Sequence, residues 1–226
     1  MISNEHKTVF IHNPKCAGSS VKTALKSNKG SWIHGDWHYT LKQLKDKSPS
    51  ISDYYKFSIV RNPYDRFVSA FTYNIEKVMD PGDYHWASYP LSYLVLRSFT
   101  DKHFASQTSW GGSDLIRTFR AFLQSPQSFR IFDKGWPIHF KPQCYFFKYA
   151  DLNTVCRYEA LMSEDCLIQK VEKDTGLTIN IPHTNMSGHP DYKEFYDVKT
   201  MDRIKKLYRD DFLQLGYNID MLGGKV

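Results

Sequence analysis

The residues best suited to chemistry are a lysine, a glycine and two serines that follow a short apolar run near the start of the chain. The run is Thr8–Ile11, and the polar residues after it are Lys15, Gly18, Ser19 and Ser20. Lysine carries a mobile positive charge, serine hydroxyls donate hydrogen bonds, and glycine lets the backbone approach a ligand closely. These residue types in this order fit a loop that binds phosphate, and they fit an ordinary strand-to-helix turn with a surface lysine equally well.

The elements on either side of this loop are predicted to be a strand and a helix. Thr8–Ile11 is apolar and β-branched, which is typical of a strand, and Val21–Leu25 is compatible with a helix. Backbone N–H groups and the helix dipole favour an anion at a helix start. The loop differs from the common P-loop, in which a lysine stands between the last glycine and a serine or threonine. Here Lys15 comes before Gly18.

A second predicted strand and helix carry another pair of polar residues. Phe57–Val60 is apolar and β-branched, and Pro63 suits the first turn of a helix. Arg61 therefore falls at the end of a strand, and Ser69 falls on the helix that follows. A cation and a hydroxyl in these places could bind a second phosphate group.

Together the two segments resemble the nucleotide-binding signatures of sulfotransferases that use 3′-phosphoadenylyl sulfate (PAPS). The segments read PKCAGSS and FSIVRNPYDRFVSAF. Later stretches, VCRYEALMSED, IPHTNMSGHPDYKEFYD and YRDDFLQLGY, are similar to the branch that includes carbohydrate sulfotransferases and many short bacterial relatives. The similarity runs from about Thr8 to Tyr217 and covers nearly the whole chain.

The resemblance implies PAPS as the cofactor, PAP as the product left after sulfuryl transfer, and no metal ion. The 5′-phosphosulfate is expected on Pro14–Ser20, and the 3′-phosphate near Arg61 and Ser69. A hydroxyl group on a carbohydrate or glycoconjugate is expected to accept the sulfuryl group. The residues expected to contact the cofactor are Pro14, Lys15, Cys16, Ala17, Gly18, Ser19, Ser20, Arg61, Ser69, Arg157, Asn185 and Ser187.

Sulfuryl transfer needs a general base for the acceptor hydroxyl and a positive charge for the leaving phosphate. Lys15 is expected to supply the charge. In the resembling family a histidine between the two signatures is thought to act as the base, and that interval contains His34 and His38. His38 is favoured because it stands directly before a predicted helix, Tyr39–Asp46. His34 is the second candidate, and His139 is the next.

The alternation of strands and helices around the two turns predicts a three-layer α/β fold in one domain, residues 1–226. A central, mainly parallel sheet is expected between helices, as in the P-loop-like sulfotransferase fold that the resemblance implies. Later elements are predicted as a strand over Leu152–Arg157 and as helices over Asp114–Leu123, Glu159–Thr175 and Val198–Gln214.

The composition agrees with a soluble protein that handles anions. The formal net charge is +6 and the pI about 9.0, which suits an anionic cofactor or substrate. The polar N-terminus and the lack of an apolar run of about 20 residues predict a soluble, cytoplasmic protein without a membrane span. No CxxC pair occurs, so neither a zinc site nor a disulfide framework is indicated. The four cysteines are Cys16, Cys144, Cys156 and Cys166.

Two other protein classes fit the sequence less well. A nucleotide kinase or NTPase with a degenerate P-loop would need a lysine directly before a serine or threonine in its loop, and the loop 14–20 lacks that pair. A nucleic-acid-binding protein would need a dense basic run with interleaved aromatic residues, and the chain has no such run. The kinase or NTPase remains the alternative, and nucleic acid is not expected as a partner.

Overall fold

The computed structural model describes residues 1–35, 38–79, 94–100, 112–128, 137–161, 163, 166–181 and 189–220. Its strands are β1 (Ile2–Ser3), β2 (Thr8–Ile11), β3 (Tyr55–Val60) and β4 (Thr154–Arg157). Its helices are α1 (Gly18–Lys26), α2 (Leu41–Lys47), α3 (Pro63–Met79), α5 (Gly112–Gln124), α7 (Ile168–Thr175), α8 (Tyr192–Phe195), α9 (Val198–Leu207) and α10 (Arg209–Leu215). Short 3-10 turns are η1 (Pro49–Asp53), η3 (Ile138–Phe140), η4 (Gln143–Tyr145), η5 (Tyr149–Asp151) and η6 (Tyr158–Ala160), and residues 94–100 are also helical.

These elements form two compact units, each of which is described by itself. The first unit contains Met1–Asn62, Pro142–Met186 and Asp210–Tyr217. The second unit contains Pro63–Lys141, Ser187–Arg209 and Asn218–Val226. A single domain therefore stays a prediction.

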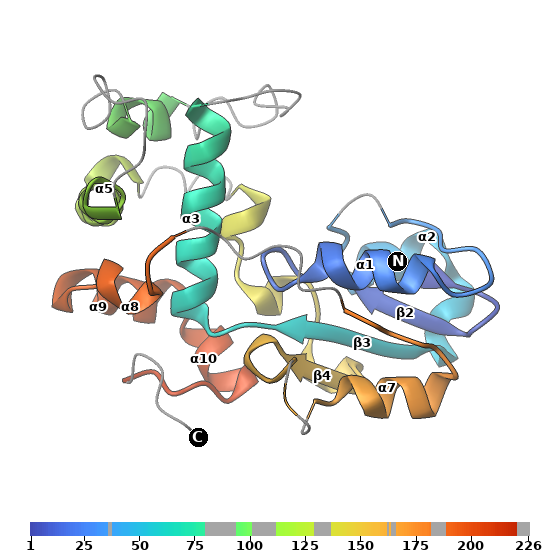
Figure 1. The fold of residues 1–226 in the computed structure, drawn as a ribbon. Coiled ribbons are helices and arrows are strands. Elements are labelled where there is room, and N and C mark those ends of the chain that lie inside the picture. Colours follow the sequence, from blue (N-terminus) through green and yellow to red (C-terminus); the bar gives the residue numbers. More distant parts are fainter. Residues whose placement is uncertain are drawn as a thin grey trace. The chain divides into compact units, whose positions relative to one another are not determined.

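A four-stranded sheet in the order β1-β2-β3-β4 lies at the centre of the first unit (Figure 1). β2 and β3 are parallel, with Phe10 opposite Phe57, and β3 and β4 are parallel, with Ile59 opposite Cys156. The short β1 is antiparallel to β2. The predicted α/β class with a mainly parallel sheet is thus confirmed. Because neighbouring parallel strands end at the same edge, the loops after β2 and β3 begin close together.

Helices α1 and α7 cover one face of this sheet (Figure 1). Val21 and Leu25 of α1 and Val171 of α7 pack in one cluster with Phe10 and Phe57 from the strands. All five side chains are fully buried, and burial of a side chain of this kind stabilises a fold by roughly 1.5–3 kcal/mol. This cluster fixes α1 against β2 and so determines where the loop between them lies.

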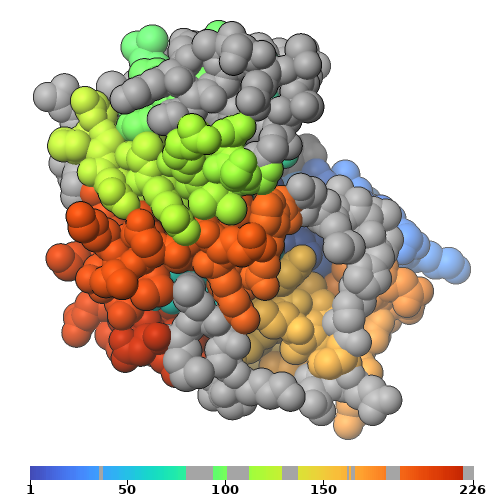
Figure 2. All heavy atoms as spheres, turned by 60° about the vertical axis from the view of Figure 1, so that its left-hand side comes forward, coloured from blue at the N-terminus to red at the C-terminus, as the bar shows by residue number. Residues whose placement is uncertain are grey.

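In the second unit, α3 is the central helix. Phe67 and Phe71 of α3 pack edge-on against Phe119 of α5, with ring centroids 5.8 and 5.3 Å apart. In Figure 2 the atoms of α5 (yellow-green) lie against those of α8 and α9 (orange). The fully buried Arg66 donates a hydrogen bond to the carbonyl of His139 at 3.2 Å. An aromatic core, with the buried guanidinium of Arg66 beside it, therefore holds the described part of this unit together.

The predicted helix over Glu159–Thr175 is wrong in its first half. The helix α7 covers only the second half of that range, and the 3-10 turn η6 precedes it. Within this turn, Glu159 accepts hydrogen bonds from the backbone N–H of Asn62 at 2.5 Å and from the hydroxyl of Tyr217 at 2.9 Å. These contacts with distant residues override the helical periodicity of the sequence.

The predicted last helix, Val198–Gln214, is also wrong, because two helices occupy that range. The break between α9 and α10 falls at Tyr208, whose φ of −118° and ψ of 27° are not helical. Tyr208 is buried, and its hydroxyl donates to the carbonyl of Phe140 at 2.6 Å. The predicted helices at Tyr39–Asp46 and Asp114–Leu123 are confirmed as α2 and α5, with small shifts at their ends.

Among the helices in the described ranges, none has both the length and the apolar character needed to cross a membrane. The helix α3 has 17 residues, with Asp65 in its first turn and Lys77 in its last.

Candidate active site

The loop between β2 and α1 has an unusual backbone. Lys15 and Ala17 both adopt the left-handed conformation, with φ of 64° and 58°, whereas Cys16 between them does not. Such a conformation costs a residue other than glycine about 1–2 kcal/mol. Alternation of left-handed and ordinary residues turns backbone N–H groups toward one side and forms a concave site for an anion. Strain of this kind persists where the surrounding structure holds it, often at a functional site.

Gly18, the first residue of α1, has no room for a side chain. A Cβ atom at this position would lie 1.9 Å from Cδ2 and 2.1 Å from Nε2 of His12. The imidazole ring of His12 therefore packs directly on the start of α1. Glycine is required here by this close approach, and not by its backbone conformation.

The N-terminal end of α1 has the features of an anion site. Ala17 occupies the N-cap position without a side-chain hydrogen bond, and no acidic residue lies in the first turn. The first N–H groups of a helix have no acceptor within the helix, and the helix dipole places positive potential around them. Ser19, which is exposed, and Ser20, which is buried, add hydroxyl groups in this turn. A phosphate or sulfate group suits this set of donors.

Arg61 adds a second cation at this place, from the end of β3. Its Nη1 donates to the carbonyl of Lys15 at 3.2 Å, and its guanidinium lies over the ring of Tyr158 at 4.2 Å. Only 7% of Arg61 is exposed. The predicted loop and the predicted arginine therefore meet directly.

His38 joins the loop through His12. Its Nδ1 lies 3.0 Å from the carbonyl oxygen of His12, and the two imidazole rings are 4.2 Å apart. Because a carbonyl oxygen only accepts hydrogen bonds, Nδ1 carries the proton, and Nε2 of the neutral ring carries the lone pair. Sequence reasoning missed His12, although its place directly after a strand of a parallel sheet was a usable signal.

The surroundings of His38 favour its neutral form. Burial lowers the pKa of His38 below the usual 6.5, and the positive charges of Lys15 and Lys22 lower it further. The hydrogen bond to the His12 carbonyl raises this pKa without reversing the shift. His38 is therefore neutral at pH 7, which is the state that a general base needs.

A comparison with protein families agrees with this geometry. Residues 1–218 match the model of the Sulfotransferase family. The chain belongs to the sulfotransferase family. The general chemistry of the family is transfer of a sulfuryl group, so the resemblance seen in the two signature segments is confirmed at the level of the family. No curated protein and no solved structure gives a significant match to the chain.

In this sulfotransferase, the side chain of Arg157 at the end of β4 makes its contacts with the residues that follow α10 and with the end of that helix. Its Nη2 donates to the carbonyls of Leu215 and Gly216 at 3.2 and 3.0 Å, and its guanidinium lies over Tyr217 at 4.8 Å. Arg157 thereby satisfies carbonyls at the carboxyl end of α10. Its predicted contact with the cofactor stays a prediction.

Two residues for which the sequence predicts a role in the site belong to the second unit. Ser69 is buried on α3. His139 lies in η3, and its ring meets that of Tyr73 edge-on at 4.8 Å. Their predicted roles, at the 3′-phosphate and as a further candidate base, stay predictions.

His34 lies in the first unit, but its ring contact is with Tyr39, at 6.0 Å. Its backbone is left-handed, with a φ of 57°. The structure thus joins His38 to the phosphate loop through its contacts with His12, whereas the ring of His34 lies beside Tyr39. The predicted contacts Asn185 and Ser187 fall outside the described residues.

Cys16 fills the inside of the phosphate loop. Its thiol is fully buried and donates to the carbonyl of Pro14 at 3.5 Å and to the side-chain oxygen of Gln143 at 3.4 Å. None of the four cysteines of the sulfotransferase forms a disulfide bond. Within the part of the chain that the structure describes, no group of three or more His, Cys, Asp or Glu side chains could hold a metal ion.

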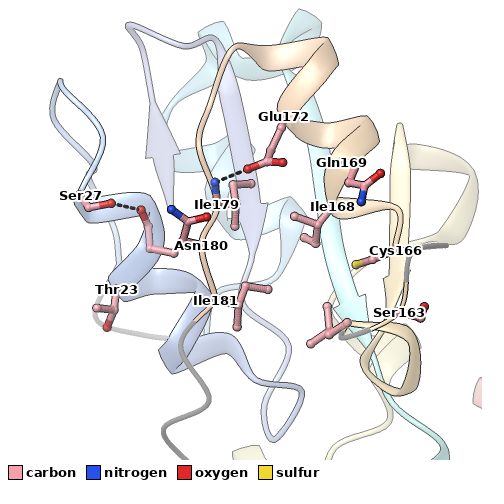
Figure 3. A pocket seen from close by; sticks show the side chains of 12 residues that line it. Thr23, Ser27, Ser163, Cys166, Ile168, Gln169, Glu172, Ile179, Asn180 and Ile181 are labelled. Atoms are coloured by element: carbon pink, nitrogen blue, oxygen red, sulfur yellow. Dashed lines mark hydrogen bonds between the residues drawn. The ribbon is translucent and has the colours of Figure 1, made fainter.

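A cavity of about 600 Å³ lies between the second half of α1 and α7 (Figure 3). Its walls include Thr23 and Ser27 on one side and Ile168 on the other. Glu172 of α7 accepts a hydrogen bond from the backbone N–H of Ile179 at 2.6 Å and so helps to hold the wall together (Figure 3). None of the predicted site residues lines this cavity.

Proposed function

We propose that this sulfotransferase takes its sulfuryl group from PAPS and transfers it to a hydroxyl group of a saccharide or glycoconjugate, with His38 as the general base. The observation that carries the proposal is the group of features around one loop. At this loop α1 begins without a side-chain cap, and Arg61 contacts the carbonyl of Lys15. A neutral His38 is also hydrogen-bonded to His12 there.

The residues around the loop fit the sulfuryl donor. The first N–H groups of α1, together with Lys15 and Ser20, suit the 5′-phosphosulfate, and Arg61 offers a separate charge for the 3′-phosphate. When bound, PAPS supplies a sulfuryl group on a phosphate oxygen that gains negative charge as the group leaves. Lys15 and the helix N–H groups stabilise negative charge at this loop, and such donors act most strongly on charge that develops during a reaction.

His38 is neutral and is protonated at Nδ1, which leaves Nε2 with the lone pair that a general base requires. Its Nε2 accepts the proton of the acceptor hydroxyl, while its Nδ1–H stays on the carbonyl of His12. This hydrogen bond keeps the ring in one orientation in both protonation states. The charges of Lys15 and Lys22, which lower the pKa of His38, then favour release of the proton.

The acceptor class rests on the resemblance of the signature segments to carbohydrate sulfotransferases. The net charge of +6 supports a partner that carries negative charge, such as an acidic or already sulfated saccharide.

An acceptor screen with labelled PAPS tests this function. Neutral saccharides, acidic saccharides, a small phenol and a tyrosine peptide are offered in parallel, and the label is expected on a saccharide hydroxyl. The same screen with labelled ATP, with and without magnesium, is the control. Transfer from ATP together with no transfer from PAPS would contradict the proposal and favour the kinase alternative.

A further inference from the structure

The side chain of Gln143 is fully buried beside the phosphate loop, and it pairs with the backbone of Arg61. The N–H of Arg61 donates to Oε1 of Gln143 at 2.9 Å, and Nε2 of Gln143 donates to the carbonyl of Arg61 at 2.9 Å. The strand β2 ends at Ile11, opposite Ser58, so it stops short of Arg61. The amide of Gln143 thus supplies the two hydrogen bonds that the backbone of Arg61 would make to β2 if that strand were longer.

The same oxygen atom of Gln143 also accepts hydrogen bonds from the phosphate loop. Nδ2 of Asn13 donates to it at 3.3 Å, and the thiol of Cys16 donates to it at 3.4 Å. Cys16 stands between Lys15 and Ala17, whose backbones are both left-handed. One buried amide therefore links the middle of the strained loop to the end of β3.

Gln143 is itself held by a carboxylate on α10. Asp211 accepts hydrogen bonds from the backbone N–H of Gln143 at 2.8 Å and from that of Cys144 at 2.9 Å. Asp211 and Gln143 are both fully buried. These two hydrogen bonds fix the backbone from which the amide extends.

We propose that Gln143 is a positioning residue, whose amide sets the distance between the phosphate loop and Arg61. This inference rests on the proposed function, because the distance matters only when one ligand uses both segments. PAP carries a 5′-phosphate for the phosphate loop and a 3′-phosphate for Arg61, whereas AMP carries only the 5′-phosphate. The ratio of the affinities for PAP and AMP therefore reports how well the two segments are spaced.

Gln143→Met tests the inference, since methionine has a similar length and makes none of these hydrogen bonds. Asn28→Leu is the matched control. The amide of Asn28 accepts from the N–H of Thr178 at 2.9 Å and donates to its carbonyl at 2.8 Å. This is the same two-point pairing, made just beyond the other end of α1. Titration calorimetry of the full chain with PAP and with AMP then compares the loss of this pairing beside the phosphate loop with the loss of such a pairing elsewhere.

Gln143→Met is expected to lower the ratio of PAP to AMP affinity by about tenfold, the size of a lost pair of hydrogen bonds. Asn28→Leu is expected to leave the ratio unchanged. An unchanged ratio in folded Gln143→Met overturns the inference and leaves the proposed function standing. A wild-type chain that binds PAP no better than AMP overturns both.

A second variant covers the case in which Gln143→Met does not fold. Asn13→Ala removes one of the two loop donors to Oε1 of Gln143, and it leaves the thiol of Cys16 and the pairing of Gln143 with Arg61 in place. It is expected to lower the same ratio by about threefold, since a single hydrogen bond is lost. A ratio equal to that of the wild type overturns the inference.

Discussion

His38 donates its Nδ1–H to the carbonyl oxygen of His12 at 3.0 Å, and the rings of the two histidines lie 4.2 Å apart. The ring of His12 in turn lies on Gly18, at the start of α1. The proposed base is therefore attached to the same loop that is proposed to hold the sulfuryl donor. A fixed attachment of this kind holds the base in a constant position relative to the anion site, which is the main requirement of an in-line transfer.

Replacement of His38 by alanine is expected to lower sulfuryl transfer by about 100-fold, the usual range for loss of a general base. Affinity for PAP is expected to stay at the wild-type value, because the proposal gives this ring no contact with the cofactor. Steady-state rates and a PAP titration measure the two effects, and His34→Ala is the control with near-normal turnover. A larger loss of turnover in His34→Ala than in His38→Ala would identify His34 as the base. Full activity in both variants would leave His139 as the remaining candidate.

The pH dependence of kcat/KM is expected to show an acidic limb below pH 6.5. His38 accepts a proton only in its neutral form, and burial and the nearby lysines lower its pKa. Activity is therefore retained as the pH falls to 6.5 and is lost as it falls through the lowered pKa. The pH profile of kcat/KM reports groups of the free enzyme, and a limb with a pKa above 6.5 would contradict the assignment of His38.

Replacement of Lys15 by alanine is expected to lower turnover by about two orders of magnitude, and PAP affinity by much less. The reason is that its charge acts on the phosphate oxygen as negative charge develops there. Lys26→Ala, in the last turn of the same helix α1, removes an equal charge away from the loop and serves as the control. Wild-type turnover of the Lys15 variant with its best acceptor would refute the proposed role of the loop.

Gly18→Ala is expected to destabilise the chain by about 1–3 kcal/mol, because the new methyl group would overlap the ring of His12. In a His12→Ala background the space is vacant, and the same substitution is expected to cost much less. Urea denaturation of the wild type, the two single variants and the double variant gives this difference as a double-mutant cycle. Additive costs would show that the ring of His12 does not rest on Gly18.

The phosphate loop could be predicted from the sequence because its signals are local. Thr8–Ile11 forms the predicted strand, α1 begins at Gly18, and β3 leads directly to Arg61. Each of these features depends on residue types within one strand, turn and helix start.

The contacts that complete the site could not be predicted in this way. Cys16 and Gln143 are separated by 127 positions along the chain, and their contact depends on the whole fold of the first unit. The same reason explains the two wrong helices. Glu159 and Tyr208 are held by distant partners, and those hydrogen bonds outweigh local helical preference.

The most direct test of the account is a calorimetric titration of the wild-type chain with PAP and, separately, with AMP. Two cationic segments around one loop predict that PAP binds at least about tenfold more tightly, because the 3′-phosphate gains a charge-assisted hydrogen bond from Arg61. Equal affinity for the two nucleotides, or no binding of PAP, would contradict the assignment of PAPS as the sulfuryl donor.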